Sequence, residues 1–265
     1  MSLQKKKCII CNSGNTTIEK ITNIKNIECE FAVCNDCDFI HNPKNYFEYK
    51  KDSFKTVSSD PKTSKRAGDG KRAGREYKMA ETTLNILKDN SPKNILLFGV
   101  GMSLDHKLLK KNFPENKVYI SDIDNFQQEE NFVHLDKNKK FDIIIASEVI
   151  EHFTDPINEF KRIFSKLNEE GMIVASTNIK DNTPLSRLLY PFLRGHTSYY
   201  SGKSLIHLAR KFGFEIDFRL PAISQNKTIG PRKRYVFFYK SPKVHDAILV
   251  YFSQRCFALS EDLRD

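Results

Sequence analysis

The stretch NILLFGVG, residues 94–101, places a short apolar run directly before two glycines. A run of this length, ended by glycine, predicts a buried strand over residues 94–98. Apolar residues then recur at helical spacing from Leu104 to Phe113, so a helix is expected to follow. A buried strand that turns through glycines into a helix is the beginning of a βαβ unit. The stretch therefore indicates an α/β fold.

The flanking sequence continues this alternation of strands and helices. Further strands are expected at residues 117–121, 132–135, 141–147 and 171–177, and helices at 77–89, from 154 onward and at 201–212. Two last strands, 214–220 and 234–239, are predicted to pair in antiparallel orientation. The pattern predicts a Rossmann-like doubly wound sheet, mostly parallel with its last strand antiparallel, whose ligand lies at the carboxyl ends of the early strands.

Four cysteines precede this α/β region in two tight pairs, Cys8-x2-Cys11 and Cys34-x2-Cys37, with 22 residues between the pairs. Two such pairs can surround one Zn²⁺ tetrahedrally, and a segment this small needs a metal to fold. The alternative, a redox-active pair, needs one CxxC followed by a helix, a setting that neither pair has. We therefore predict a small N-terminal zinc ribbon over residues 1–43.

Composition describes a folded chain that carries excess positive charge. The 265 residues have a formal net charge of +10, and residues 44–78 alone hold eleven Lys or Arg against five Asp or Glu. This predicts a basic, substrate-facing segment at 44–80 before a main domain at 81–265, and it favours an acidic partner. No apolar run reaches the roughly 20 residues of a membrane span, and the N-terminus does not resemble a signal peptide. A cytoplasmic location is expected.

Three features after successive strands indicate a nucleoside cofactor. Gly99 and Gly101 allow close approach of a ligand to the backbone, and Asp122 follows the next strand, where a carboxylate can hold ribose hydroxyls. The third feature is the segment SEVIEHFTDP, residues 147–156. A dinucleotide enzyme would require a fuller GxGxxG, and it would leave this segment unexplained.

Residues 96–156 resemble class I S-adenosylmethionine-dependent methyltransferases, in particular the group whose fourth strand continues into a motif of the form EVIEH. The segment HTSYYS at 196–201, with the glycine and phenylalanine at 213–214, resembles the same group. The N-terminal ribbon is similar to the first part of bacterial sugar and capsular-polysaccharide methyltransferases. The resemblance implies a methyltransferase with S-adenosylmethionine as cofactor and a structural zinc ion.

The resemblance also implies roles for individual residues of the cofactor site. Glycines 99 and 101 would pass beneath the methionine part, Asp122 would hold the ribose, and the remaining contacts would come from Ile123, Asp136, Ser147 and Glu148. The family usually carries an acid two positions before the first glycine. Here that position is Leu97, and the third glycine position is Ser103, so the contact to the methionine amino group is left unassigned.

Methyl transfer from a sulfonium needs an aligned acceptor, and an oxygen acceptor also needs a base. His152 and His196 are the candidates, although His152 can equally have a structural role at a helix start. Guanidinium groups suit a phosphate-bearing acceptor. We expect O-methylation of a small phosphorylated or sugar-nucleotide precursor of a capsular polysaccharide, or of its phosphoramidate modification, bound by Arg72, Arg75, Tyr199 and Arg232.

Two other functions remain open from the sequence. The first is an RNA methyltransferase in which the ribbon binds nucleic acid, which the basic composition allows but does not favour. The second is a zinc-ribbon binding module fused to a fold without turnover, an interpretation to which Leu97 gives some weight.

Overall fold

The computed structural model describes residues 7–50, 53, 67–89, 91–220 and 233–261, with no side chains described for 254–261. Its central sheet is mostly parallel and has the strand order β5-β4-β6-β7-β10-β9. The strands are β4 (Asn94–Phe98), β5 (Lys117–Ser121), β6 (Phe141–Ser147), β7 (Leu167–Asn178), β9 (Glu215–Arg219) and β10 (Lys233–Tyr239). The predicted α/β class is thus confirmed.

The strands whose bounds were predicted correctly are apolar runs rich in β-branched residues. The bounds of β4, β5 and β6 coincide with the expected ones, and β4 pairs with β5 in parallel from Asn94↔Lys117 to Phe98↔Ser121. The strand expected at 132–135 is wrong, because only a single bridge joins Ile120 to Phe132. The Asn131 side-chain amide donates to the Val118 carbonyl and takes an acceptor that a longer strand would use.

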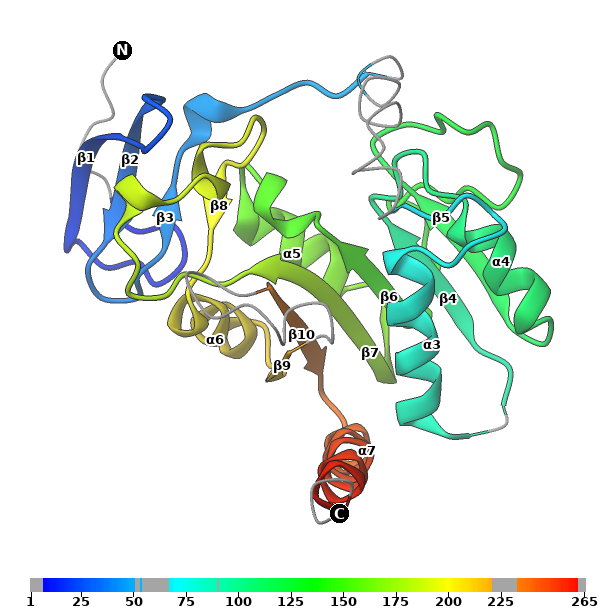
Figure 1. Cartoon of the computed structure of the whole chain (residues 1–265). Coiled ribbons are helices and arrows are strands. Elements are labelled where there is room, and N and C mark those ends of the chain that lie inside the picture. Colours follow the sequence, from blue (N-terminus) through cyan, green and yellow to red (C-terminus); the bar gives the residue numbers. More distant parts are fainter. Residues whose placement is uncertain (1–6, 51–52, 54–66, 90, 221–232, 262–265) are drawn as a thin grey trace. The chain divides into compact units, whose positions relative to one another are not determined.

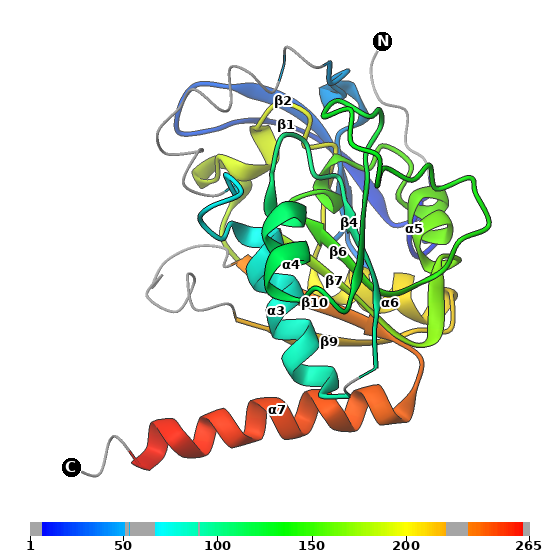
Figure 2. The same ribbon diagram turned by 90° about the vertical axis from the view of Figure 1, so that its right-hand side faces the viewer.

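The chain divides into two compact units, each built from several sequence segments. One unit comprises Asp52–Ile145, Lys166–Val174 and Tyr239–Asp265. It contains the helices α3 (Arg75–Leu87), α4 (Asp105–Asn112) and α7 (Pro242–Glu261). Helix α3 packs on α4 and also contacts α7, which runs across one end of α3 (Figure 2).

The other unit comprises Met1–Lys51, Ala146–Ser165 and Ala175–Phe238. It contains a second sheet of order β1-β2-β3-β8, made of β1 (Thr16–Thr22), β2 (Glu28–Cys34), β3 (Ile40–His41) and β8 (Ser198–Tyr199), as Figure 1 shows. Strands β1 and β2 form an antiparallel hairpin, and Ile40 of β3 pairs with Tyr199 of β8. The division at residues 43 and 80 that the sequence suggests stays a prediction.

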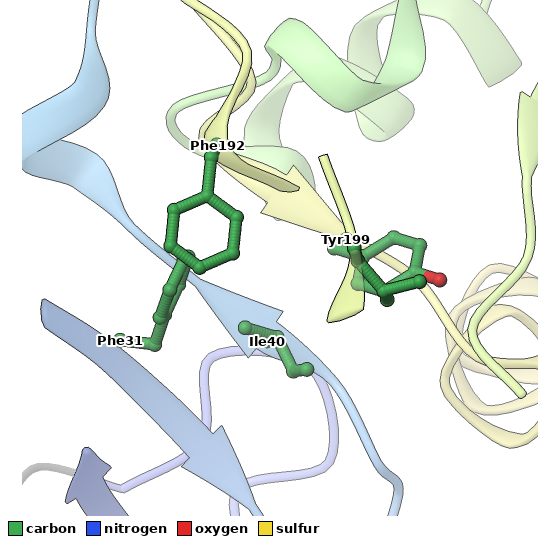
Figure 3. Packing of buried hydrophobic residues seen from close by; sticks show 5 residues of the cluster. Phe31, Ile40, Phe192 and Tyr199 are labelled. Atoms are coloured by element: carbon green, nitrogen blue, oxygen red, sulfur yellow. The ribbon is translucent and has the colours of Figure 1, made fainter. Parts of the chain in front are cut away.

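A hydrophobic cluster holds the later strand against the N-terminal ones. Phe31, Ile40, Leu188, Phe192 and Tyr199 are all buried, and the Phe31 and Phe192 rings meet edge to face with centroids 5.0 Å apart (Figure 3). Such aromatic pairs add to the stabilisation that burial alone provides. The ribbon therefore shares its core with residues 185–199.

Helices α5 (Pro156–Phe164) and α6 (Gly202–Lys211) of this unit begin at side-chain caps. Asp155 accepts from the Asn158 amide, with proline as the next residue, and Ser201 forms a capping box with Ser204. Both helices were predicted within one or two residues, apart from the C-terminal end of α5. Within the described ranges, none of the helices combines the length and the apolar character that a bilayer crossing requires.

Candidate functional site

The four predicted zinc ligands lie together. Cys8, Cys11, Cys34 and Cys37 form a cluster in which all ligand atoms are within 4.8 Å of one another. Both pairs adopt the same turn: the amides of Asn12 and Asp38 donate to the carbonyls of Cys8 and Cys34, and both residues have left-handed φ values. The two CxxC segments thus present their sulfurs in equivalent ways.

The spacing of the sulfurs fits a tetrahedral metal centre. The Cys8–Cys37 and Cys11–Cys34 sulfur pairs are each 3.6 Å apart. Four sulfurs at about 2.3 Å from a zinc ion would be separated by about 3.8 Å. Cys29 lies outside this cluster and packs beside the hydrophobic cluster of Figure 3. The half-buried His41 ring instead has its Nε2 3.1 Å from the Thr154 carbonyl.

The glycine turn after β4 is held together by the carboxylate expected to bind ribose. Gly99 and Gly101 both have positive φ, at 71° and 53°. Asp122 accepts from the backbone amides of Gly101 and Ile123, both at 2.7 Å. The Ile123 side chain is 67% exposed beside this carboxylate. The turn therefore offers a carboxylate of fixed orientation and an apolar surface next to it, and both features suit a nucleoside.

The two departures from the family pattern have structural explanations. Leu97 is buried in β4 and belongs to the core. The Ser103 hydroxyl donates to Oε2 of Glu76 at 3.0 Å and accepts from the Gly68 amide at 3.3 Å. Burial raises the pKa of Glu76 to about 8, and so does the hydrogen bond that the protonated Glu76 carboxyl donates to the neighbouring Asp105 carboxylate. A buried acid thus lies beside the third glycine position, and the sequence analysis missed it.

The basic loop before α3 is organised by acidic side chains. Asp105 accepts from the amides of Gly74 and Tyr77, at 2.8 and 3.0 Å. Asp69 accepts from the Lys71 and Arg72 amides and from the Arg72 side chain, contacts that lower its pKa to about 2. Arg72, which was predicted to bind the substrate, thus forms an ion pair with Asp69.

Three further residues were predicted to contact the cofactor or the substrate. Arg75 is half-buried at the start of α3, and Asp136 is exposed. Arg232 lies outside the described residues.

Ser147 and Glu148 end β6 and start the EVIEH segment. The Ser147 hydroxyl is 3.3 Å from that of Ser176, and the Ser176 hydroxyl also donates to Glu148 at 3.0 Å. Glu148 has a positive φ of 58° and forms an ion pair with Lys233. The backbone leaves the strand abruptly here, and the Glu148 charge is already balanced.

The two candidate bases form a group with Glu151, which we call the acid–imidazole cluster. Ligand atoms of Glu151, His152 and His196 all lie within 4.8 Å of one another. The short helix Ile150–His152 carries the first two, and the Thr197 amide donates to the Glu151 carbonyl at 3.0 Å, which holds His196 beside them. The imidazole rings meet at 90° with centroids 4.8 Å apart. The sequence prediction named both histidines, and the structure brings them together.

Two tyrosines surround this cluster. The buried Tyr190 hydroxyl donates to Oε1 of Glu151 at 2.8 Å, and burial raises the Tyr190 pKa well above its usual value, so the donor keeps its proton. The Tyr49 hydroxyl is 3.3 Å from Nδ1 of His152. Burial and then the adjacent His152 ring lower the pKa of His196 to about 3. Neither tyrosine was predicted, because nothing in the sequence near them indicates the contact.

Tyr199, expected to line the substrate site, is 2% exposed, and its ring is part of the hydrophobic cluster. Figure 3 shows the ring beside Ile40, which comes from the ribbon. Its hydroxyl has no hydrogen-bond partner among the residues that the structure describes. Packing accounts for the ring, and the substrate role stays a prediction.

Solved structures resemble this chain in fold at low sequence identity. The plantazolicin methyltransferase BpumL, in complex with a triazolic substrate analogue and SAH, is 14% identical with a TM-score of 0.49, over 72% of this chain and 95% of that chain. LepI in complex with SAM is 12% identical with a TM-score of 0.48, over 71% and 55%. The pyocyanin biosynthetic protein PhzM is 12% identical with a TM-score of 0.44, over 60% and 54%.

No curated protein matches the chain. A family described as "Methyltransferase domain" matches residues 72–217. These residues make up more than half of the 265 in the chain, and they include the glycine turn, Asp122 and the EVIEH segment. The chain belongs to this methyltransferase family.

Proposed function

We propose that the chain transfers a methyl group from S-adenosylmethionine to an oxygen of a small phosphorylated or sugar-nucleotide acceptor. The observation that carries the cofactor assignment is the turn in which Gly101 donates to Asp122, within a segment that matches the methyltransferase family. In the reaction the acceptor oxygen forms a bond to the methyl carbon, and the sulfur–methyl bond breaks with its electrons left on sulfur. The hydroxyl proton leaves to a base or to water.

The residues of the turn suit the cofactor chemically. Both carboxylate oxygens of Asp122 already accept one backbone hydrogen bond each, and each retains a lone pair for a ribose hydroxyl. The exposed Ile123 side chain would pack on the adenine. Asp136, Ser147 and Glu148 would supply further contacts to the cofactor. When bound, the cofactor supplies an activated methyl group, so that the protein has mainly to align the acceptor and exclude water.

The proposed acceptor class rests on charge. Residues 44–78 hold an excess of basic side chains, and guanidinium groups bind phosphate in a bidentate manner. Arg75 and Arg232 are proposed to contact the phosphate, and Arg72 would do so after leaving Asp69. We place the reaction in the cytoplasm, in the supply of precursors for a capsular polysaccharide or its phosphoramidate modification.

We also propose that the four-cysteine cluster holds a structural zinc ion. The sulfur spacing supports this assignment, and so does the position of Cys34 and Cys37 around the turn between β2 and β3. The ion would fix the start of the ribbon, which has little core of its own.

Calorimetry with S-adenosylhomocysteine tests the cofactor assignment. The wild-type chain should bind it, and Asp122→Ala should lower the affinity by about 10-fold or more, because hydrogen bonds to a charged group contribute about 1.5–3 kcal/mol. Asp124→Ala, at an exposed position two residues further on, is the matched control. Absence of binding by the wild-type chain would refute the enzyme assignment, and unchanged affinity in Asp122→Ala would refute the role of that residue.

A second experiment separates the acceptor classes. Release of S-adenosylhomocysteine is measured with sugar phosphates, with sugar nucleotides and with short RNA, each over a series of salt concentrations. Turnover with the small phosphorylated compounds supports the proposal. Turnover with RNA alone, with binding that weakens steeply as salt rises, would favour an RNA methyltransferase.

A further inference from the structure

We propose that the acid–imidazole cluster of Glu151, His152 and His196 binds one divalent transition-metal ion, separate from the four-cysteine cluster. Two imidazoles and one carboxylate suit Mn²⁺, Fe²⁺, Co²⁺ or Zn²⁺, whereas Mg²⁺ and Ca²⁺ prefer oxygen ligands throughout. The contacts of Glu151, His152 and His196 support the existence of the site. Its catalytic use, to hold the acceptor oxygen, rests on the proposed function.

The buried carboxylate of Glu151 has an oxygen whose hydrogen-bonding capacity is not satisfied among the described residues. Glu151 is 1% exposed, and its Oε1 accepts from the Tyr190 hydroxyl. Its Oε2 has no hydrogen-bond partner among the described residues, and no ion pair to Glu151 occurs among them. A buried carboxylate oxygen without a donor is costly. A metal ion at this oxygen would remove that cost.

Both imidazole rings have a ring nitrogen that can bind a metal ion. Nδ1 of His152 is 2.9 Å from the Gly195 carbonyl, which can only accept, so Nδ1 carries the proton and Nε2 presents its lone pair. Metal-binding histidines are oriented in this way, by donating the other ring N–H to a carbonyl. Nδ1 of His196 is also buried without a partner among the described residues. The cluster thus contains a free ligand atom on each of its three side chains.

The charges around the cluster leave Glu151 as its unpaired acid among the described residues. Glu148, three residues before Glu151, is paired with Lys233, whose charge also acts on His196. That pairing leaves the Glu151 carboxylate as the ligand that can neutralise a cation. Ligands on one ion at about 2.1 Å are about 3.0–4.2 Å apart. Ligand atoms of the three side chains lie within 4.8 Å of one another, close to these separations.

A bound ion would lower the pKa of a coordinated acceptor hydroxyl. The hydroxyl proton would leave to water, and the resulting oxygen would take the methyl group as the sulfur–carbon bond breaks. Under the proposed function, this gives His152 and His196 a role as ligands in place of a role as bases.

Manganese binding tests the proposal, because Mn²⁺ has little affinity for thiolates and gives a distinct electron paramagnetic resonance signal. The full chain, with zinc already bound, is titrated with Mn²⁺. We expect about one Mn²⁺ bound per chain, and Glu151→Gln and His196→Asn should each weaken binding by 10-fold or more. His134→Asn, at an exposed histidine, is the control and should bind as the wild type does.

Circular dichroism and S-adenosylhomocysteine binding on the same samples report folding and the proposed function separately. If a ligand variant fails to fold, Tyr190→Phe leaves all three ligands in place and removes the donor to Glu151, together with the hydroxyl's contacts to Thr177 and to the Asn178 amide. It should still weaken Mn²⁺ binding. Wild-type chain that binds S-adenosylhomocysteine but no Mn²⁺ overturns the metal site alone. Chain that binds Mn²⁺ but no S-adenosylhomocysteine overturns the proposed function and keeps the site. Equal Mn²⁺ affinity in wild type and all three of these variants overturns the ligand assignment.

Discussion

The buried Glu76 should make the stability of the chain fall as pH rises through neutrality. Its carboxyl is buried, accepts from the Ser103 hydroxyl and shares a hydrogen bond with Asp105, so that its pKa is about 8 against an ordinary 4.5. Between these two values the folded chain holds a proton that the unfolded chain has lost. The free energy of unfolding therefore decreases with rising pH in this window, and the decrease ends above about pH 8.

The size of the effect follows from the two pKa values. Each pKa unit corresponds to about 1.4 kcal/mol, so the full difference corresponds to on the order of 5 kcal/mol at alkaline pH. The expected difference is about 2–5 kcal/mol. Glu76→Gln keeps an acceptor for Ser103 and a donor for Asp105, but it cannot ionise. The variant should gain stability over the wild type by this amount between pH 5 and pH 9.

Urea unfolding followed by circular dichroism at pH 5, 7 and 9 measures the effect. Glu130→Gln removes the same charge at an exposed position and should follow the wild-type curve at all three pH values. The difference in the free energy of unfolding between Glu76→Gln and wild type should change from pH 5 to pH 9. A change of less than about 0.5 kcal/mol would refute the buried, protonated carboxyl.

Two further outcomes are expected from the unit that contains the ribbon. Metal analysis should find about one zinc per chain bound at the four-cysteine cluster; Cys34→Ser should lose it and Cys29→Ser should keep it, whereas equal zinc in both would contradict the ligand assignment. Ser201→Ala removes the cap of α6 and the donor to the Cys37 carbonyl at 2.6 Å, so it should cost about 1–3 kcal/mol. Thermal unfolding measures this cost, and a melting temperature within 1 °C of wild type would contradict it.

The strands of the central sheet were predictable because a short apolar run in the sequence indicates a buried strand. β4 and β6 are apolar runs ended by a turn, and both were found with correct bounds. Helix α7 was missed although Val244, Ile248 and Tyr251 are buried at helical spacing. That signal was present in the sequence. The strand expected at 132–135 failed for a different reason, because a side-chain amide competes for the strand edge.

The candidate sites divide in a similar way. The four cysteines could be predicted from their spacing alone, since each CxxC turn is local. The two histidines could be named individually, but their meeting depends on a long-range contact between residues 151 and 197. Tyr190 and Tyr49 had no signal at all, because their neighbours are distant in sequence. A single sequence therefore indicates ligands that lie close together along the chain. It does not indicate partners that are distant in sequence and meet only in the folded protein.

The two departures from the family pattern, at Leu97 and Ser103, are of different kinds. β4 is buried along residues 95–98, so an acid at position 97 would require a partner that the core around Leu97 does not offer. A glycine at position 103 could neither donate to Glu76 nor accept from the Gly68 amide, whereas the serine hydroxyl does both. The serine thus links the glycine turn to the basic loop and to α3.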